Sequence, residues 1–280
     1  MMKNTVVACL LLCLLGGAVL EAGTGNIIWV RRSDTANLER QADQVWIDHL
    51  VNQGYTVTDG GYEVLNDQTL AELNATDLII MGRGSDSGAY DDTATIGGNS
   101  VQEEVAWNSL VTAPLLNMTP YLTRTSRWNW LSTNSTEGVD LDPHTLTALD
   151  PDHAAFTGIV LDGNNQINVT TPGVLCQLEF NPVLPDAGNG TIIALGTNGQ
   201  IQIAEWTAGA SFIDGSVAGA RRMLLNLSID LNAGVLTNFM DGLTSESIQM
   251  FDNLVADMVV PEPATLLIVG AGALFIRRRK

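Results

Sequence analysis

Short apolar runs alternate with amphipathic segments along the first half of the chain, and this alternation restricts the fold more than any other feature. Four runs are typical of β-strands: 27–30, 55–58, 77–81 and 114–118. Between the first two, apolar residues recur at helical spacing, at Leu38, Ala42, Val45, Trp46 and Leu50. The run at 77–81 is apolar at consecutive positions, which is typical of a strand buried on both faces. We therefore expect right-handed β-α-β units and a doubly wound, mainly parallel sheet.

Polar residues and glycines mark where the helices of this half should begin and end. Ser33 and Asp34 can cap the first helix at its N-terminus, and Gly54 is placed to end it. Ser100 with Glu103 has the spacing of a capping box. This spacing predicts that another helix begins just after Ser100.

The second half is richer in strands. Five short segments predict extra β-strands: 158–161, 166–169, 174–180, 191–196 and 201–206. The segment at 221–229 alternates like a further strand, whereas 123–156 is polar and rich in turn residues. Thr244 is placed to cap a last helix, whose apolar face consists of Ile248, Phe251, Val255 and Met258.

Both ends of the chain carry the pattern of an export signal. Residues 1–22 have the charged start and apolar core of a secretory signal peptide, so we expect an N-terminal signal helix there. At the other end, an uncharged run at 264–276 is followed by four cations. As a helix this run rises only about 20 Å, against a bilayer core of about 30 Å. We expect a short transmembrane helix with its cations on the cytoplasmic side.

The tail combines a proline-containing breaker, an apolar run and a basic end. Its defining residues are Pro261, Glu262, Pro263, Arg277, Arg278, Arg279 and Lys280. This arrangement resembles the PEP-CTERM sorting signal of Gram-negative bacteria, and a motif of the same type occurs at the C-terminus of some ice-binding proteins. The N-terminal pattern implies that signal peptidase removes 1–22. The resemblance of the tail implies that an exosortase-type enzyme recognises 259–280 and cleaves near Pro-Glu-Pro. It also implies an inner-membrane intermediate and a final place at the cell surface or outside the cell.

The body between the two signals is strongly acidic. Residues 23–260 contain eight arginines, no lysine and 29 aspartates and glutamates, which gives a formal charge of −21. Nucleic acid is not an expected partner, because phosphate backbones bind to cationic patches. An acidic surface favours solubility and can attract divalent cations. The length of the body fits one large domain, which we place at 23–258.

Three stretches of the body carry a second resemblance. They are "IIWV" at 27–30, "DPDHAAFTGIVLDG" at 150–163, and "RRMLLNLSI" with "LTSESIQMFDNLVADM" at 221–258. Together they are similar to the class I glutamine-amidotransferase-like group, near the trehalose-utilisation protein family. The resemblance implies a flavodoxin-like sheet and a final helix opened by Leu-Thr.

The chain departs from that group at the nucleophile. An active amidotransferase holds a cysteine between glycines on a strand-to-helix turn, and no Gly-x-Cys-x-Gly occurs here. Cys176, the single cysteine of the body, lies inside an apolar run and is expected to be a small buried residue without a disulfide. Glutaminase chemistry is therefore not expected, and no catalytic residue is assigned.

Two segments follow predicted strands at the edge where open α/β sheets bind ligands. The first, "GRGSDSG" at 82–88, offers Ser85, Asp86 and Ser87; its alternative role is a flexible glycine loop. The second, "RTSRWNW" at 124–130, offers Arg124, Arg127, Trp128 and Trp130. Exposed tryptophan with arginine can stack on a sugar ring and bind its hydroxyls, or the same residues can pack the loop onto the sheet. If the topology is right, both segments lie at one edge.

The loop "DLDPHTLTALDPDH" at 140–153 is a candidate site for a divalent metal. Its candidate ligands are Asp140, Asp142, His144, Asp150, Asp152 and His153. Carboxylates with imidazole suit Zn²⁺ or another transition metal, and carboxylates with carbonyl oxygens suit Ca²⁺. The spacing matches no closed zinc or EF-hand pattern. A solvated acidic loop with Asp-Pro turns is therefore the alternative.

The sequence thus predicts an exported surface or biofilm-matrix protein that binds polysaccharide or another surface molecule without catalysis. The alternative is a metal-assisted carbohydrate hydrolase or isomerase that uses 140–153, and a third option is a ligand sensor that uses the glycine loop. The enzyme gains support if the residues of 140–153 converge on one point near the strand ends. It loses support if they stay dispersed.

Overall fold

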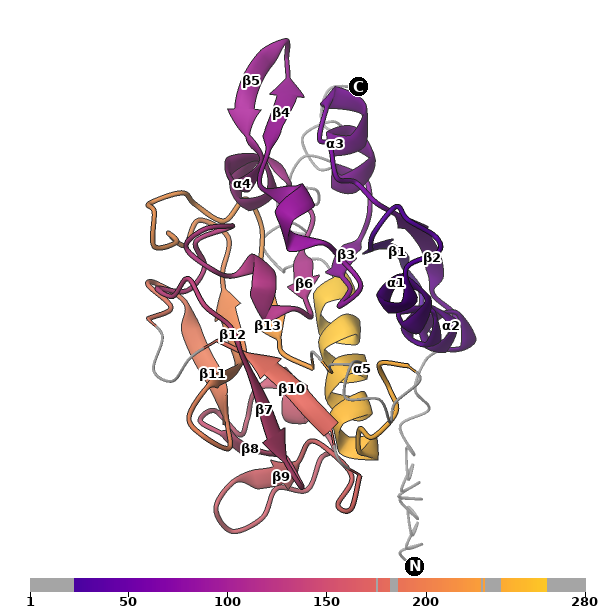
Figure 1. The fold of residues 1–280 in the computed structure, drawn as a ribbon, viewed down its shortest axis with the longest axis vertical. Coiled ribbons are helices and arrows are strands. Elements are labelled where there is room, and N and C mark those ends of the chain that lie inside the picture. Colours follow the sequence, from indigo (N-terminus) through magenta and orange to yellow (C-terminus); the bar gives the residue numbers. More distant parts are fainter. Residues whose placement is uncertain (1–22, 175, 182–185, 228, 230–237, 261–280) are drawn as a thin grey trace, which may run out of the picture.

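A nine-stranded mixed sheet forms the centre of the protein, in a computed structural model that describes residues 23–174, 176–181, 186–227, 229 and 238–260 (Figure 1). The strand order is β2-β1-β3-β6-β13-β12-β11-β8-β9. In that order the strands are Thr56–Gly60, Asn26–Val30, Leu78–Met81, Leu115–Asn117, Arg222–Leu225, Ile201–Trp206, Thr191–Gly196, Thr145–Ala148 and Gln166–Asn168. Two small antiparallel pairs lie outside this sheet: β4 (Thr93–Ile96) with β5 (Asn99–Gln102), and β7 (Glu137–Leu141) with β10 (Cys176–Phe180).

The sheet has a parallel part and an antiparallel part. β2, β1, β3, β6 and β13 run parallel, in an order found in doubly wound sheets. From β13 outward to β9, each neighbouring pair is antiparallel. The expectation of an α/β fold with a large sheet and extra strands from the second half is confirmed, and the sheet that we expected to be mainly parallel is mixed. β13 lies at the junction, because it is parallel to β6 and antiparallel to β12.

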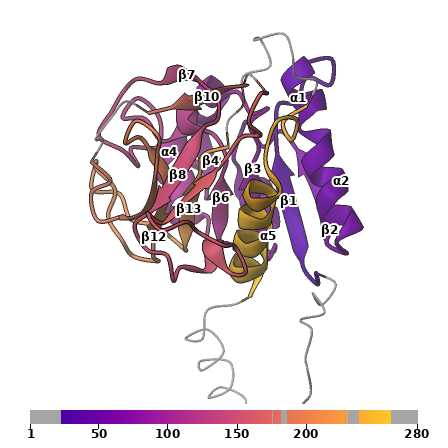
Figure 2. The ribbon, with the colours of Figure 1, turned by 90° about the horizontal axis from the view of Figure 1, so that it is seen from below.

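Helices cover both faces of the parallel part (Figure 2). One face carries α1 (Leu38–Ala42), α2 (Gln44–Asn52) and α5 (Ser245–Val259). The other carries α3 (Asp67–Asn74) and α4 (Glu103–Val105), which continues as a π-helical turn at Ala106–Leu110. Three 3₁₀ turns lie in the connections: Ser87–Tyr90, Pro120–Leu122 and Ala154–Phe156.

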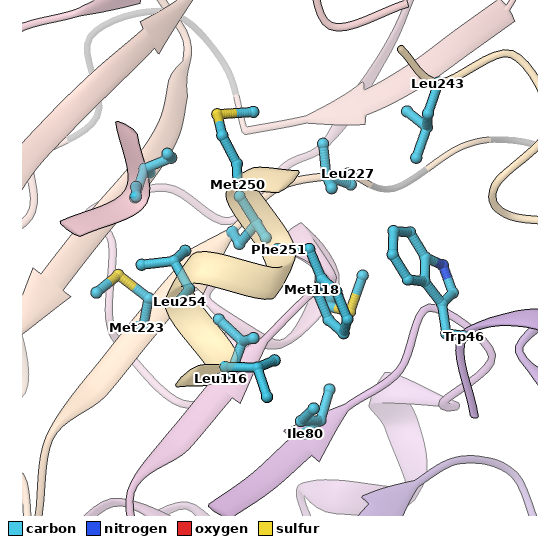
Figure 3. Packing of buried hydrophobic residues seen from close by; sticks show 14 of the residues in the cluster. Trp46, Ile80, Leu116, Met118, Met223, Leu227, Leu243, Met250, Phe251 and Leu254 are labelled. Carbon is cyan, nitrogen blue, oxygen red and sulfur yellow. The ribbon is translucent and has the colours of Figure 1, made fainter. Parts of the chain in front are cut away.

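The last helix closes one face of the sheet, as the sequence predicts. Thr244 caps α5, since its hydroxyl oxygen accepts the N–H of Ser247 at 3.2 Å. Phe251 packs against Trp46 of α2 with ring centroids 4.4 Å apart. Figure 3 shows this face of α5 against side chains of β3, β6 and β13. One apolar cluster therefore joins α2, α5 and the parallel strands.

The capping box predicted at Ser100 is wrong. Ser100 lies in β5, which pairs with β4 across a turn made by Gly97 and Gly98. Both glycines have positive φ, +58° and +75°, a conformation that tight hairpin turns need and other residues rarely adopt. The helix instead begins at Glu103, whose buried carboxylate accepts the N–H of Leu65 at 3.0 Å.

Two other expectations about local structure are also wrong. Asn37, rather than Ser33 or Asp34, caps α1, and its side-chain oxygen accepts the N–H of Arg40 at 3.1 Å. The segment 158–161 forms no strand, and Val160 within it is 88% exposed. A short apolar run is therefore not sufficient for a strand where no neighbouring strand is available to pair with it.

The predicted signal helix at 1–22 and the predicted membrane helix at 264–276 lie outside the described residues. Within the part of the chain that the structure describes, no helix is both long and apolar enough to cross a bilayer.

A buried arginine lies at the junction of the sheet. Arg222, the first residue of β13, is fully buried. Its guanidinium donates to main-chain oxygens at 3.0–3.1 Å, those of Trp107, Asn108 and Ala113, and to that of Val111. These oxygens belong to the end of the π-helical turn and the link to β6, where the helical carbonyls have no partner within the helix. Burial lowers the pKa of Arg222 to about 9, so it remains charged at neutral pH.

Replacing this guanidinium should destabilise the whole fold. In Arg222→Met, the buried main-chain oxygens of Trp107, Val111 and Ala113 lose the guanidinium donor, whereas that of Asn108 keeps the N–H of Gly219. We expect the free energy of unfolding to fall by about 3 kcal/mol or more. The free energy of unfolding of Arg222→Lys should lie between those of Arg222→Met and the native protein, because an ammonium has too few donors for these oxygens. Urea denaturation measures the effect. Arg127→Met, which removes a partly exposed ion pair with Asp91, is the matched control and should cost less than about 1 kcal/mol.

Candidate functional site

The carboxyl ends of the parallel strands gather most of the positive charge of the body. β1, β3 and β6 end at Val30, Met81 and Asn117, and the loops that follow lie at one edge of the sheet, here called the carboxyl edge. Six of the eight arginines of 23–260 lie on these loops or on α1 beside them: Arg31, Arg32, Arg40, Arg83, Arg124 and Arg127. We call these six residues the arginine cluster. Open α/β sheets bind ligands at this edge.

Part of the arginine cluster is held by acidic residues. Arg31 is buried and donates to Asp59 from Nε at 3.0 Å and from Nη2 at 2.9 Å. Arg40 donates to the same oxygen of Asp59 at 2.6 Å, and also to the main-chain oxygen of Arg32. Two guanidinium groups therefore share the single carboxylate of Asp59.

Two further arginines converge on one aromatic ring. The Cζ atom of Arg83 lies 5.0 Å from the centroid of Tyr121, and that of Arg124 lies 5.7 Å from it. Arg83 is also 5.9 Å from the ring of Phe239, so its plane is held between aromatic side chains. Its nearest acidic partner is Glu39 at 3.4 Å. Arg83 is only 7% exposed, and its Nε has no hydrogen-bond partner among the described residues.

A buried carboxylate lies beneath the arginine cluster. Asp43, between α1 and α2, is fully buried, and its Oδ2 accepts the N–H of Gly84 at 2.9 Å. The indole nitrogen of Trp29 lies beside it near Gly82 and favours its charged form, whereas Asp43 Oδ1 has no partner in the described part of the chain. Burial raises the pKa of Asp43 to about 7, against the lowering effects of the Gly84 hydrogen bond and of Arg31. No motif in the sequence singles out Asp43.

The structure brings the two ligand-binding candidates of the sequence together at the carboxyl edge. The Oγ of Ser87 accepts a hydrogen bond from Arg124 Nη2 at 3.3 Å, which joins the glycine loop to the arginine segment. Asp86 lies 3.6 Å from Arg32, and its Oδ1 accepts the N–H of Gly88. Ser85 is buried, and its hydroxyl has no partner among the described residues. These polar groups surround one patch of surface.

The tryptophans of the second segment do not form an open platform. Trp128 and Trp130 are fully buried and belong to a row of rings in which Trp107 and Trp128 stack at 5.3 Å. Trp130 continues the row to Trp206, with centroids 5.1 Å apart, and its indole N–H donates to Asn108 at 2.8 Å. The structure therefore shows the packing alternative for these two residues. Neither ring is available to stack on a sugar.

The metal candidates at 140–153 are dispersed. Asp140 lies in β7, Asp142 accepts the N–H of Gly173 at 2.7 Å, and His144 is buried beside Phe180. The other three lie in the next turn, where Asp150 and Asp152 are exposed and His153 faces Glu205 at 3.5 Å. Across the residues that the structure describes, no three side chains of histidine, cysteine, aspartate or glutamate are placed to hold a metal ion.

The three histidines and the single cysteine of the body lie away from the carboxyl edge. His49 pairs with Asp252 at 2.7 Å between α2 and α5. The other two histidines, His144 and His153, lie within 140–153. Cys176 lies within strand β10, which pairs with β7, and not on a strand-to-helix turn. The expectation that no nucleophile elbow is formed at this cysteine agrees with its position.

Comparisons with known proteins support the two resemblances drawn from the sequence. Residues 259–280 match the PEP-CTERM protein-sorting motif, which implies export toward the cell surface and processing by an exosortase-type enzyme. Among solved structures, a ThuA-like protein from Bacteroides uniformis superposes with a TM-score of 0.50 at 10% identity, covering 85% of this chain and 91% of that chain. This likeness shows the fold, and it agrees with the resemblance to the trehalose-utilisation family. A sequence search finds no significant match among curated proteins.

Tryptophan fluorescence tests the packing of the indole rings. All six tryptophans of the chain are at most 1% exposed. Acrylamide should therefore quench the tryptophan emission of the native protein weakly and that of the urea-unfolded protein strongly. The emission maximum of the native protein should lie at a shorter wavelength than that of the unfolded protein. Strong quenching of the native protein would contradict the buried positions of Trp128 and Trp130.

The buried carboxyl of Asp43 should make stability depend on pH. Because its folded pKa is raised from 3.8 to about 7, the folded state holds this proton more tightly than the unfolded state does. Its contribution is thus most favourable below the unfolded pKa and declines as the pH rises toward about 7. Asp43→Asn removes this titration, so the melting temperature of the variant should rise relative to that of the native protein between about pH 4 and about pH 7 and change no further above it.

Thermal melts over this pH range measure the difference between Asp43→Asn and the native protein. Asp34→Asn, at an exposed position on the same edge, is the control for losing one negative charge. A difference that stays constant with pH would show that Asp43 does not titrate near neutrality.

Proposed function

We propose that the protein is an exported, non-catalytic component of the cell surface or extracellular matrix that binds an acidic polysaccharide at its carboxyl edge. In this proposal signal peptidase removes 1–22, residues 23–258 form the α/β binding domain, and 259–280 is the sorting signal. The apolar run at 264–276 holds the chain in the inner membrane until an exosortase-type enzyme acts. The body then reaches the cell surface or the outside of the cell.

The observation that carries the proposal is the arginine cluster in an otherwise anionic body. Six of eight arginines lie at one edge of a body with a formal charge of −21. Guanidinium groups match the geometry of carboxylates with two parallel hydrogen bonds. Charges farther away than about 8–10 Å are screened at physiological ionic strength. Within that distance the six arginines have four carboxylate partners, those of Glu39, Asp59, Asp86 and Asp91, so the arginines outnumber their acidic partners. A short stretch of uronic acid residues would interact with this surplus.

Arg124 is the member of the cluster best suited to an added anion. Among the described residues it has no carboxylate within ion-pair distance, and its contacts are the Tyr121 ring, the Tyr121 main-chain oxygen at 2.9 Å and Ser87. Burial lowers the pKa of Arg124, and the nearby charge of Arg127 lowers it further. A bound carboxylate would relieve that repulsion. Arg83 and Ser85, which have buried polar atoms without partners, lie on the neighbouring loop.

The enzymatic alternative has less support from the geometry. A metal-assisted hydrolase or isomerase would need the candidates of 140–153 to converge near the strand ends. They lie instead on β7, on the β7–β8 connection and in the turn before Ala154–Phe156, with separate partners. We therefore favour binding over catalysis.

Calorimetry with the exported protein tests the ligand class. We expect an oligosaccharide of uronic acid to bind, and a neutral oligosaccharide of equal length to bind far more weakly. Affinity should fall as salt is raised, because the contacts are ionic. In Arg124→Gln it should fall roughly tenfold, the effect of losing one charge-assisted pair.

Arg221→Gln is the matched control for this experiment, because Arg221 lies outside the cluster and pairs with Glu205 and Asp257. Its affinity should equal that of the native protein, with melts confirming that both variants are folded. Equal binding of the acidic and neutral sugars would overturn the proposed ligand class. An unchanged affinity in Arg124→Gln would remove the cluster from the site.

A further inference from the structure

The first and last described segments of the chain meet at the edge of the sheet opposite the arginine cluster. Gly25, just before β1, lies so close to Val259 that a Cβ at position 25 would stand 2.5 Å from Val259 Cγ1. The N–H of Gly23 donates to the main-chain oxygen of Gln53, where α2 ends, at 2.8 Å. Figure 2 shows the start of β1 and the end of α5 on the same side of the molecule. We call this side the amino edge, because the parallel strands begin there.

The surface around this meeting point is polar and slightly hollowed. A depression of about 300 Å³ lies between the starts of β3, β6 and β13 and the last turn of α5. Its polar lining includes Asn74, Thr76, Asp77 and Thr112. Val259 lies in its wall, and Val260, the next residue, is 63% exposed. The chain thus leaves the body from the rim of this depression.

The sorting tail begins almost without a linker. α5 ends at Val259, and the apolar run begins at Ala264, so 260–263 is the whole connection. Four extended residues span at most about 14 Å. Two of them are prolines, which cannot continue the helix with its hydrogen bonds. The headgroup layer on each side of a bilayer is roughly 5–8 Å thick. A body tethered by this connection therefore lies directly against the headgroups.

We propose that the amino edge is the membrane-facing surface of the tail-anchored protein, and that the arginine cluster faces away from the bilayer. The proposal rests on the insertion of 264–276 into the membrane under the proposed function. Its partner is the polar lipid surface, which suits the amide and hydroxyl groups around the depression. In this orientation the carboxyl edge is open to its ligand before the tail is processed, and the processing enzyme meets the amino edge first.

Depth-dependent fluorescence quenching tests this orientation. The tail-bearing protein is produced without an exosortase, purified and reconstituted into phosphatidylcholine vesicles, with Cys176→Ser to leave one introduced thiol. Ala208→Cys, at the exposed rim of the depression, and Ala36→Cys, exposed at the carboxyl edge, form a matched pair of sites for the label. A quencher carried on the lipid headgroup should suppress the label at 208 several-fold more than the label at 36.

A spacer provides an internal control on the same vesicles. Twelve Gly and Ser residues inserted between Val260 and Pro261 should release the body from the surface and reduce quenching at 208 toward the value at 36. Equal quenching at both positions, or stronger quenching at 36, in the unmodified chain would overturn the proposed orientation. Flotation of the vesicles distinguishes a wrong orientation from a tail that does not insert. Protein that does not float with the lipid has no inserted tail. That result would overturn both the membrane tether of the proposed function and the orientation that rests on it.

Discussion

A single cation without a carboxylate partner stands at the point where the sheet changes from parallel to antiparallel. Arg222 opens β13, which pairs with β6 on one side and β12 on the other. Among the described residues, the two Nη atoms of its guanidinium donate to main-chain oxygens and its Nε has no partner. Such a group is costly to bury, and it is tolerated because it donates to four buried carbonyl oxygens, of which only that of Asn108 has a second donor, the N–H of Gly219, within the described part of the chain. The connection from α4 to β6 and the placement of β13 are thereby fixed together, and the strand ends that carry the arginine cluster depend on both.

The carboxyl edge depends on the absence of side chains at two positions of the loop after β3. A Cβ at position 82 would lie 2.3 Å from Asp43 Oδ2, and one at position 84 would lie 2.7 Å from the same oxygen. The two glycines let the loop close over the buried carboxylate, and this places Arg83 between Tyr121 and Phe239. Close packing against Asp43 thus explains why this loop is rich in glycine. The same packing sets the positions of Arg83 and Ser85, which lie on the loop.

Features set by local chemistry could be predicted from the sequence, and features set by tertiary contacts could not. The strands at 27–30 and 78–81 and the cap at Thr244 follow from periodicity and capping, and the structure has them. Ser100 has a valid capping spacing, but the Gly97-Gly98 turn two residues earlier makes a hairpin instead. For the candidate site, the sequence placed two loops at one edge correctly. It could not show that Trp128 and Trp130 turn inward, or that Asp43 lies beneath the arginines, because both depend on residues far away in the chain.

The position of α5 at the end of the folded body has a consequence for the order of events during export. α5 supplies Met250, Phe251 and Leu254 to the apolar face over Trp46 and the central strands, so that face stays uncovered until this helix has crossed the membrane (Figure 3). The helix is the last folded element before the sorting motif at 259–280. An exported chain can therefore complete this face only once α5, which directly precedes the sorting motif, is available to fold.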